Sequence, residues 1–158
     1  TLEAGHHRMK YLVLSIAIAM VMIACKTDSA NHTVQIKTSA LTLNLSCNGT
    51  GDTTVLLLPG LSGKSSNWLG VSASRSLNSK GCAFDFMPAG ELITGGDIVS
   101  AAISALHREG TSRNTILIAH SFGGYIAQLL YQTRAVGIAG AVLVESSHPD
   151  MMRCINLW

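Results

Sequence analysis

A serine stands in the hexapeptide Ala-His-Ser-Phe-Gly-Gly at residues 119–124, in the surroundings of a catalytic nucleophile. In the pattern small-x-Ser-x-Gly, the serine lies on a sharp strand-to-helix turn, so its hydroxyl projects clear of the backbone. The residues two places before and two places after it must be small, and here they are Ala119 and Gly123. Ser121 is therefore predicted to attack a carbonyl carbon and to carry a covalent acyl intermediate.

The elements on either side of this serine are the ones that the turn requires. Thr115–Ala119 is an apolar run that favours a buried strand, and Phe122–Tyr131 is predicted to be a helix. The first backbone N–H of that helix, on Phe122, would point at the negative oxygen that develops on an attacked carbonyl. An ordinary exposed serine on a Gly-rich turn is the alternative, and the flanking strand and helix favour the catalytic one. His120 and Gly124 complete this predicted nucleophile elbow.

The rest of the chain predicts an α/β fold with a mostly parallel sheet. Strands that are apolar on both faces alternate with helical segments, which is typical of parallel sheets covered by helices. Asp97 is predicted to begin a helix that Gly110 ends, and a loop with a short helix is predicted over 61–78. The predicted strands are an edge strand around Val34 and Ile36, then Leu41–Ser46, Val55–Leu58, Cys82–Phe86, Thr115–Ala119 and the buried Ala139–Val144.

From about Leu41 to Asp150 the sequence resembles the α/β-hydrolase superfamily, and within it exported bacterial members. Four segments carry this resemblance: Leu45-Ser-Cys-Asn-Gly49, Leu58-Pro-Gly-Leu-Ser-Gly63, Ala119–Gly124 and Val144-Glu-Ser-Ser-His-Pro149. The resemblance implies a serine hydrolase that acts on small ester substrates without a cofactor. It also implies that the backbone N–H of Leu61 joins that of Phe122 in the oxyanion hole, and that His120 packs under the oxyanion loop.

The resemblance also implies a geometry for two cysteines. In this fold the strand that carries Cys82 lies antiparallel to the strand that ends near Cys47, so the two side chains could face each other. A disulfide and two buried free thiols are both compatible with that placement. No Cys or His spacing in the chain suggests a zinc site, and no metal is predicted.

The acid and the base of a catalytic triad are not evident in the sequence. In this superfamily the chain order is nucleophile, acid, then histidine, whereas here the chain ends about a dozen residues after the Ala139–Val144 strand. We therefore expect a hydrolase domain truncated before its last two strands and inactive or nearly so. Glu145, at the end of a strand, is the best local candidate for the acid. His148 and Asp150 are weaker substitutes, because His148 is expected to shape a turn.

Two other function classes are compatible with parts of the chain. Leu58–Ser65 ends in Gly63-Lys64-Ser65 after a buried strand, as in a phosphate-binding P-loop of pattern G-x-x-x-x-G-K-[ST]. Leu58 stands where that pattern needs its first glycine, so the loop would be too short to wrap a phosphate. The other alternative is a non-catalytic lipoprotein that keeps the fold as a binding module.

The first forty residues are predicted to lie outside the catalytic fold. Residues 1–8 precede a plausible start at Met9, and residues 9–25 resemble an export signal, with Lys10, the apolar run Leu12–Ala24 and then Cys25. Cys25 follows this run as in bacterial lipoproteins, where the cysteine is lipidated and anchors the protein to a membrane. An ordinary cleaved signal and an uncleaved anchor are the alternatives. Residues 26–40 are expected to be a linker with an edge strand, and residues 41–158 the partial hydrolase domain.

Composition sets the outer limits of these interpretations. The chain has 158 residues, 13% of them charged, and a formal net charge of +2. Soluble domains average about 25% charged residues, so a disordered charged tail is excluded. The few positive charges are spread along the chain and form no footprint for nucleic acid. The sequence therefore predicts one exported domain, either anchored in a membrane or periplasmic.

Overall fold

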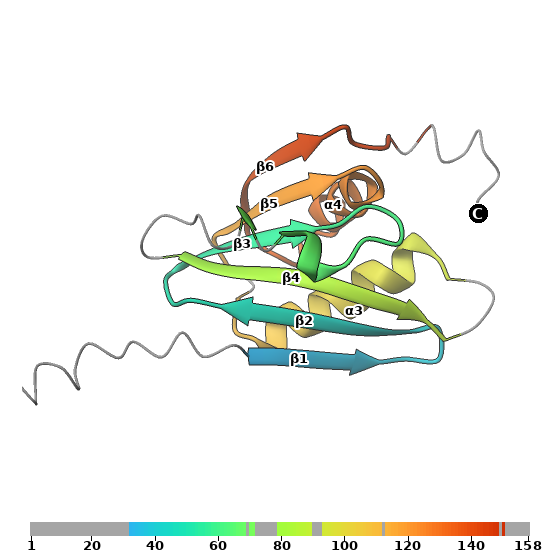
Figure 1. The fold of residues 1–158 in the computed structure, drawn as a ribbon, viewed down its shortest axis with the longest axis horizontal. Helices are drawn as coiled ribbons and strands as arrows, with labels where there is room; N and C mark the ends of the chain where they lie inside the picture. The colour runs from blue at the N-terminus through green and yellow to red at the C-terminus, as the bar shows by residue number, and fades with distance from the viewer. Residues whose placement is uncertain are drawn as a thin grey trace, which may run out of the picture.

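The computed structural model describes residues 32–68, 70–71, 79–89, 93–111, 113–148 and 150. These residues form a six-stranded sheet in the order β1-β2-β4-β3-β5-β6, with two helices, α3 and α4, behind it in the view of Figure 1. The predicted export segment, Cys25 and residues 151–158 lie outside the described residues. Within the described part, no helix is long and apolar enough to cross a membrane.

The first half of the sheet is antiparallel. β1 (His32–Lys37) pairs with β2 (Leu41–Asn48), and β2 pairs with β4 (Ser79–Pro88). Every second residue of β2 is buried, because the alternation of leucine with polar residues places one face on the core and the other toward solvent. The predicted strand over Leu41–Ser46 is therefore confirmed, and it extends two residues further.

The second half of the sheet is parallel and positions the elbow. β4 pairs with β3 (Thr53–Leu58), β3 with β5 (Thr115–His120), and β5 with β6 (Ile138–Val144), all in parallel. Three of the five pairings are thus parallel, and the sheet is mixed with a parallel majority. Because the carboxyl ends of parallel strands meet at one edge, the loops after β3, β5 and β6 come together there.

The N-cap of helix α3 (Gly95–Arg108) lies three residues before the one that the sequence predicts. Thr94 is the N-cap, its hydroxyl accepts a bond of 3.2 Å from the amide of Asp97, and the Asp97 carboxylate accepts one of 2.9 Å from the amide of Thr94. Asp97 was predicted as the cap, and this prediction is wrong. The reason is a capping box, in which the acidic residue stands at the third helical position. The helix ends just before Gly110, as predicted, and Gly110 itself has a φ of +71°.

Helix α4 (Phe122–Thr133) follows β5 directly. Together α3 and α4 cover one face of the sheet, and the core lies between that face and the helices (Figure 1). Helix α3 packs against β1 and β2, and α4 against β3, β5 and β6; the buried face of α3 includes the small residues Ala101, Ala102 and Ala105, which lets helix and sheet approach closely. The largest fully buried side chains are Phe84, Leu41, Leu43, Leu45, Leu56, Leu57, Leu58, Leu106, Leu117 and Leu130.

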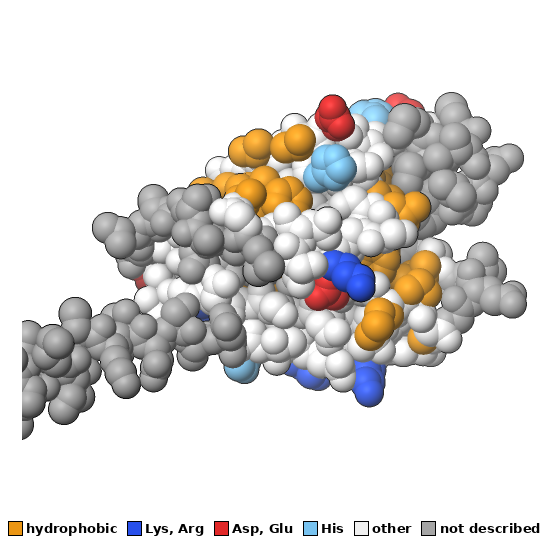
Figure 2. Space-filling model, in the orientation of Figure 1, with side chains coloured by type: hydrophobic (Ala, Val, Ile, Leu, Met, Phe, Trp, Pro, Cys, Tyr) orange, Lys and Arg blue, Asp and Glu red, His pale blue; other side chains and the backbone are white. Residues whose placement is uncertain are grey.

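Strand β6 differs from its prediction as a buried strand. Val142, Leu143 and Val144 are 53%, 47% and 43% exposed. Figure 2 shows hydrophobic side chains gathered over this part of the molecule, whereas the face over β1 and β2 is mostly uncharged and polar. The physical reason is that β6 is the edge of the sheet among the described residues, and α4 covers only part of one of its faces.

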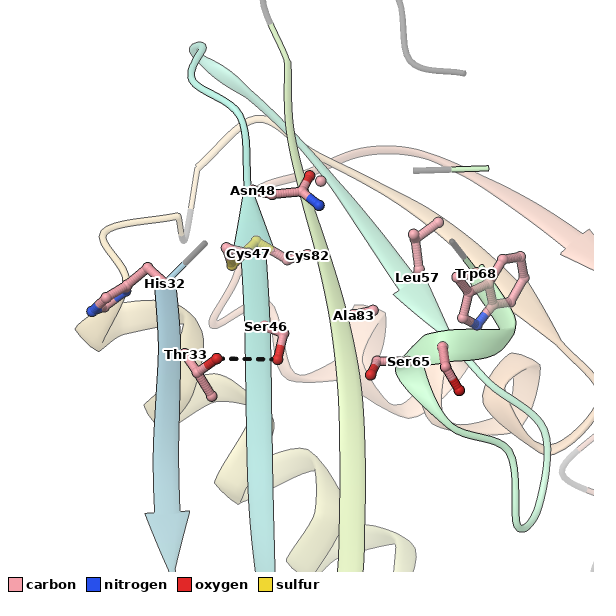
Figure 3. A pocket seen from close by; sticks show the side chains of 12 residues that line it. His32, Thr33, Ser46, Cys47, Asn48, Leu57, Ser65, Trp68, Cys82 and Ala83 are labelled. Carbon is pink, nitrogen blue, oxygen red and sulfur yellow. Dashed lines mark hydrogen bonds between the residues drawn. A yellow bond between two sulfur atoms is a disulfide. The ribbon is translucent and has the colours of Figure 1, made fainter. Parts of the chain in front are cut away.

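Cys47 and Cys82 are directly opposite each other on β2 and β4 and form a disulfide. Their Cα atoms are 4.1 Å apart, and the bridge joins residues separated by 35 positions (Figure 3). Both side chains belong to the core, with exposed fractions of 3% and 0%. The bridge therefore ties the two central antiparallel strands together at one end of the sheet.

Candidate active site

Ser121 is the single residue between β5 and α4. Its backbone has a positive φ, a conformation that residues other than glycine rarely adopt. Its φ is 51° and its ψ is −121°. Positive φ places the Cβ of an L-residue against its own backbone, at a cost of the order of 1–3 kcal/mol. Such strain persists only where the surroundings impose it, and it concentrates at functional sites. The side chain of Ser121 is half-buried at this turn.

The two glycines after the serine allow α4 to start against neighbouring backbone. A Cβ on Gly123 would clash with the carbonyl oxygen of Leu58 and lie 2.6 Å from that of Pro59. A Cβ on Gly124 would lie 2.5 Å from the Cβ of Ser146 and overlap its hydroxyl. Only glycine fits at either position, which explains the Gly-Gly of the motif.

The loop after β3 lies beside the serine. A Cβ on Gly60 would be 3.3 Å from the Cβ of Ser121 and 3.1 Å from Nδ1 of His120. The amide of Gly63 donates a bond of 2.9 Å to the carbonyl of Gly60, which closes the loop into a tight turn. The exposed His120 ring thus stands against Gly60, and Leu61, the predicted second oxyanion donor, follows at the tip of this loop and is 66% exposed.

A cavity of about 540 Å³ opens between this loop and the elbow. Its walls combine apolar side chains with the polar side chains of Ser62, Asn67 and His120. Its lining residues are Pro59, Gly60, Leu61, Ser62, Gly63, Asn67, Trp68, His120 and Val144.

The segment after β6 holds the serine's backbone on both sides, which sequence reasoning did not foresee. The Ser121 amide donates a bond of 3.1 Å to the carbonyl of Val144. The Ser121 carbonyl accepts bonds of 2.9 Å from the amide of Gly124 and 3.0 Å from that of Ser147. Both peptide groups of the strained residue are therefore fixed. The Ser-Ser of the motif Glu-Ser-Ser-His-Pro was the available signal.

The candidate acid and its neighbours lie at the end of β6. Glu145 is exposed and has φ 45°, so it reverses the chain after the strand. Nδ1 of His148 accepts a bond of 3.2 Å from the amide of Asp150 and lies 3.5 Å from its carboxylate, and both side chains are largely exposed. His148 thus bonds within its own turn. Among the described residues, neither Glu145 nor His148 is hydrogen-bonded to Ser121.

The Gly-Lys-Ser segment does not form a phosphate loop. It leads into η1 (Ser65–Trp68), a four-residue 3-10 turn. The Asp85 carboxylate accepts bonds of 2.6 Å from the amide and 2.7 Å from the hydroxyl of Ser65. Ser65 is therefore occupied by an anion of the protein itself, and the nucleotide-binding interpretation has no support here.

Two carboxyl groups with shifted pKa values lie on α3, away from the elbow. Hydrogen bonds from the side chain and backbone of Thr94 lower the pKa of Asp97. Burial raises the pKa of Glu109, but bonds from His32, at 2.5 Å, and Lys80, at 3.1 Å, outweigh burial, so the pKa is lowered overall. Both groups serve stability rather than chemistry at Ser121.

A second cavity, of about 300 Å³, lies across the sheet between β1 and η1 (Figure 3). Its floor is formed by small and hydroxyl side chains, and Thr33 and Ser46 bond each other there at 3.3 Å. Its lining includes neither His120 nor a residue of the loop 59–63, so it is separate from the cavity beside the elbow. The described residues also contain no group of three or more metal-binding side chains.

This fold has known counterparts. The sequence profile of the Alpha/beta hydrolase family matches residues 55–157, and the chain belongs to that family. A search of curated proteins finds no match.

Solved structures share the fold at low sequence identity. The carboxylesterase CesB from Bacillus subtilis is 17% identical, with a TM-score of 0.60 over 78% of this chain and 48% of its own. A thermophilic esterase from Thermogutta terrifontis is 20% identical, with a TM-score of 0.63 over 75% of this chain and 48% of its own. An alpha/beta hydrolase from Novosphingobium aromaticivorans is 20% identical, with a TM-score of 0.61 over 79% and 48%. The chain thus spans about half the length of these proteins.

Proposed function

We propose that this chain carries the nucleophile and the oxyanion hole of a serine hydrolase that acts on small esters through an acyl-enzyme on Ser121. The observation that supports this most is the positive φ of Ser121 at the junction of β5 and α4. Strained residues concentrate at functional sites, and a serine held at positive φ between a strand and a helix has the geometry of a nucleophile elbow. The carboxylesterase and the esterase of the same fold support the choice of ester substrates.

In the proposed reaction, the Ser121 hydroxyl oxygen attacks the ester carbonyl carbon and loses its proton to a base. The backbone N–H groups of Phe122 and Leu61 stabilise the oxyanion, since Phe122 begins α4 and Gly60 holds its loop against Ser121. The C–O bond to the alcohol then breaks, which leaves the acyl group on Ser121 until water hydrolyses it.

The chain is proposed to be nearly inactive as it stands, because a base for Ser121 is missing from the described residues. Four histidines are described: His32 bonds Glu109, His107 lies 3.3 Å from the Ala135 carbonyl, and His148 bonds Asp150. The fourth, His120, stands against Gly60. Glu145 remains the proposed acid of the triad, although none of the four described histidines is hydrogen-bonded to it.

Ester turnover tests this proposal. Loss of the catalytic histidine costs a serine protease about a million-fold in kcat. We therefore expect hydrolysis of p-nitrophenyl acetate and butyrate close to the background rate, and any residual rate to disappear in Ser121→Ala. Turnover typical of a complete esterase would overturn the proposed inactivity, and a residual rate that survives Ser121→Ala would overturn the role of Ser121.

Export and lipidation are a second part of the proposal. The disulfide between Cys47 and Cys82 supports an oxidising compartment, because such bridges are rare in the cytosol. We propose that residues 9–25 direct export and that Cys25 is acylated, which anchors the chain to a membrane. Growth with a labelled fatty acid should label the wild-type chain but not Cys25→Ser. Equal labelling of both proteins would contradict the proposal.

A further inference from the structure

The side chain of Gln128 lies one helical turn beyond the elbow and connects α4 to the segment after β6. Its Nε2 donates bonds of 3.1 Å to the carbonyl of Ser147 and 3.2 Å to that of Gly124. Two carbonyl oxygens can be bonded only by a donor, so the NH₂ end of the amide must face them. The half-buried Gln128 is thus held in one orientation.

The same segment reaches Ser121. The N–H of Ser147 donates its bond to the Ser121 carbonyl, and the C=O of Ser147 accepts bonds from Gln128 and from the hydroxyl of Ser146, so both backbone polar groups of Ser147 are bonded. Glu145, at φ 45°, makes the reversal that brings this peptide back over α4. Ser147 is only 8% exposed, so water replaces these bonds poorly.

We infer that Gln128 is a positioning residue for Ser121, acting through the backbone of Ser147. The inference rests on the proposed function, because it assigns Gln128 to the geometry of the same nucleophile. Without the donor of Gln128, the Ser147 carbonyl keeps only the bond of 3.1 Å from the hydroxyl of its neighbour Ser146, and the backbone of Ser147 loses its connection to α4. A shift of Ser147 leaves the Ser121 carbonyl with only its bond from Gly124, and the side chain of Ser121 loses its fixed place at the start of α4.

A thiol at position 121 reports this placement without requiring catalysis. The start of a helix lowers the pKa of a thiol from about 8.5 to between about 3.5 and 7.5, provided that the sulfur stays at the helix terminus. The test uses Ser121→Cys in a Cys25→Ser, Cys154→Ser background, in which the Cys47–Cys82 bridge remains. The rate of alkylation by iodoacetamide is measured against pH.

Three substitutions of Gln128 distinguish the effect of its hydrogen-bond donor from the effect of its side-chain length. Gln128→Met keeps the length without a donor, Gln128→Glu places an acceptor against two carbonyls, and Gln128→Lys restores a donor. We expect Gln128→Met and Gln128→Glu to raise the apparent pKa of the thiol by about one pH unit, which is a tenfold change in the ratio of thiolate to thiol. Gln128→Lys should bring the pKa back toward its value with Gln128. Gln132→Met, an exposed glutamine on the same helix, is the control and should change nothing.

The outcomes distinguish this inference from the proposed function. A thiol pKa near 8.5 before any change at Gln128 would overturn both, because the elbow would not hold its side chain at the helix terminus. A lowered thiol pKa that Gln128→Met leaves unchanged would overturn only the role of Gln128. Thermal melting of each variant identifies effects of general destabilisation, which cannot account for a shifted pH profile that Lys reverses.

Discussion

Gly123 and Leu58 are in contact through their backbones, so closely that a Cβ on Gly123 would overlap the Leu58 carbonyl oxygen. This contact brings the start of α4 against the end of β3, and it thereby places the loop from Pro59 beside Ser121. The elbow and the oxyanion loop are therefore one packing unit rather than two adjacent features. Substitution at Gly123 should disturb both.

Gly123→Ala is expected to lower the free energy of unfolding by about 1–3 kcal/mol, the usual cost of overpacking. The obstructing atoms belong to the backbone of Leu58 and Pro59 and cannot rotate away. Urea unfolding followed by circular dichroism measures the change. Gly96→Ala is the control: Gly96 is an exposed residue of α3 whose added Cβ would lie 3.5 Å from the nearest atom, so this substitution should be neutral or stabilising. Equal effects at the two positions would refute the contact.

The strain at Ser121 predicts an unusual order of stabilities. Ser121→Gly should be more stable than Ser121→Ala by about 1 kcal/mol, because glycine adopts positive φ without steric cost. At Ser104, exposed on α3, the order should reverse, since alanine is favoured over glycine in a helix by about 1 kcal/mol. Melting temperatures of the four variants test this. Alanine more stable than glycine at position 121 would mean that the elbow is unstrained.

The disulfide should contribute substantially to stability. Closing a loop between residues 35 positions apart is worth about 3–4 kcal/mol in the chain-entropy treatment. We expect reduction, or the double substitution Cys47→Ala and Cys82→Ala, to lower the urea midpoint by the corresponding amount. Thiol counting on denatured protein, with and without reductant, provides the control. Two additional free thiols without reductant would show that the bridge is absent.

Stability should fall in acid through Glu109. Its pKa in the folded chain is below the ordinary value of 4.5, so the unfolded chain binds the proton more readily. The stabilisation from Glu109 is therefore complete above that value and is lost as the pH falls through and below it. Urea unfolding between pH 3 and 7 should show a shallower acid slope for Glu109→Gln, and an unchanged one for the exposed Asp52→Asn. Parallel slopes for wild type and Glu109→Gln would contradict the ion pairs with His32 and Lys80.

The features predicted correctly from the sequence are those that local chemistry determines. The leucine alternation of β2 and the apolar runs of β3 and β5 are sufficient to identify strands, since side-chain period and burial agree there. The strand-to-helix turn at 119–124 was identifiable because small residues are needed at fixed distances from Ser121. Thr94 was missed as the cap, because Asp97 is also a good capping residue and only the backbone geometry separates them.

The features that were missed depend on contacts between distant segments. The bonds from Ser147 to Ser121 and from Gln128 to Ser147 involve a peptide group and an amide that occur in any helix or loop. The exposure of β6 depends on its place in the sheet and not on its apolar sequence. The bonds from Ser65 to the Asp85 carboxylate likewise join residues twenty positions apart in the chain.

The central claim is that Ser121 is the nucleophile, and forced labelling with a fluorophosphonate tests it most directly. The probe is applied at high concentration for hours, so that a serine without a base still reacts, and the modified residue is located by peptide mapping. We predict slow labelling that maps to Ser121 and is absent from Ser121→Ala. Labelling spread over other serines, or undiminished in Ser121→Ala, would contradict the claim.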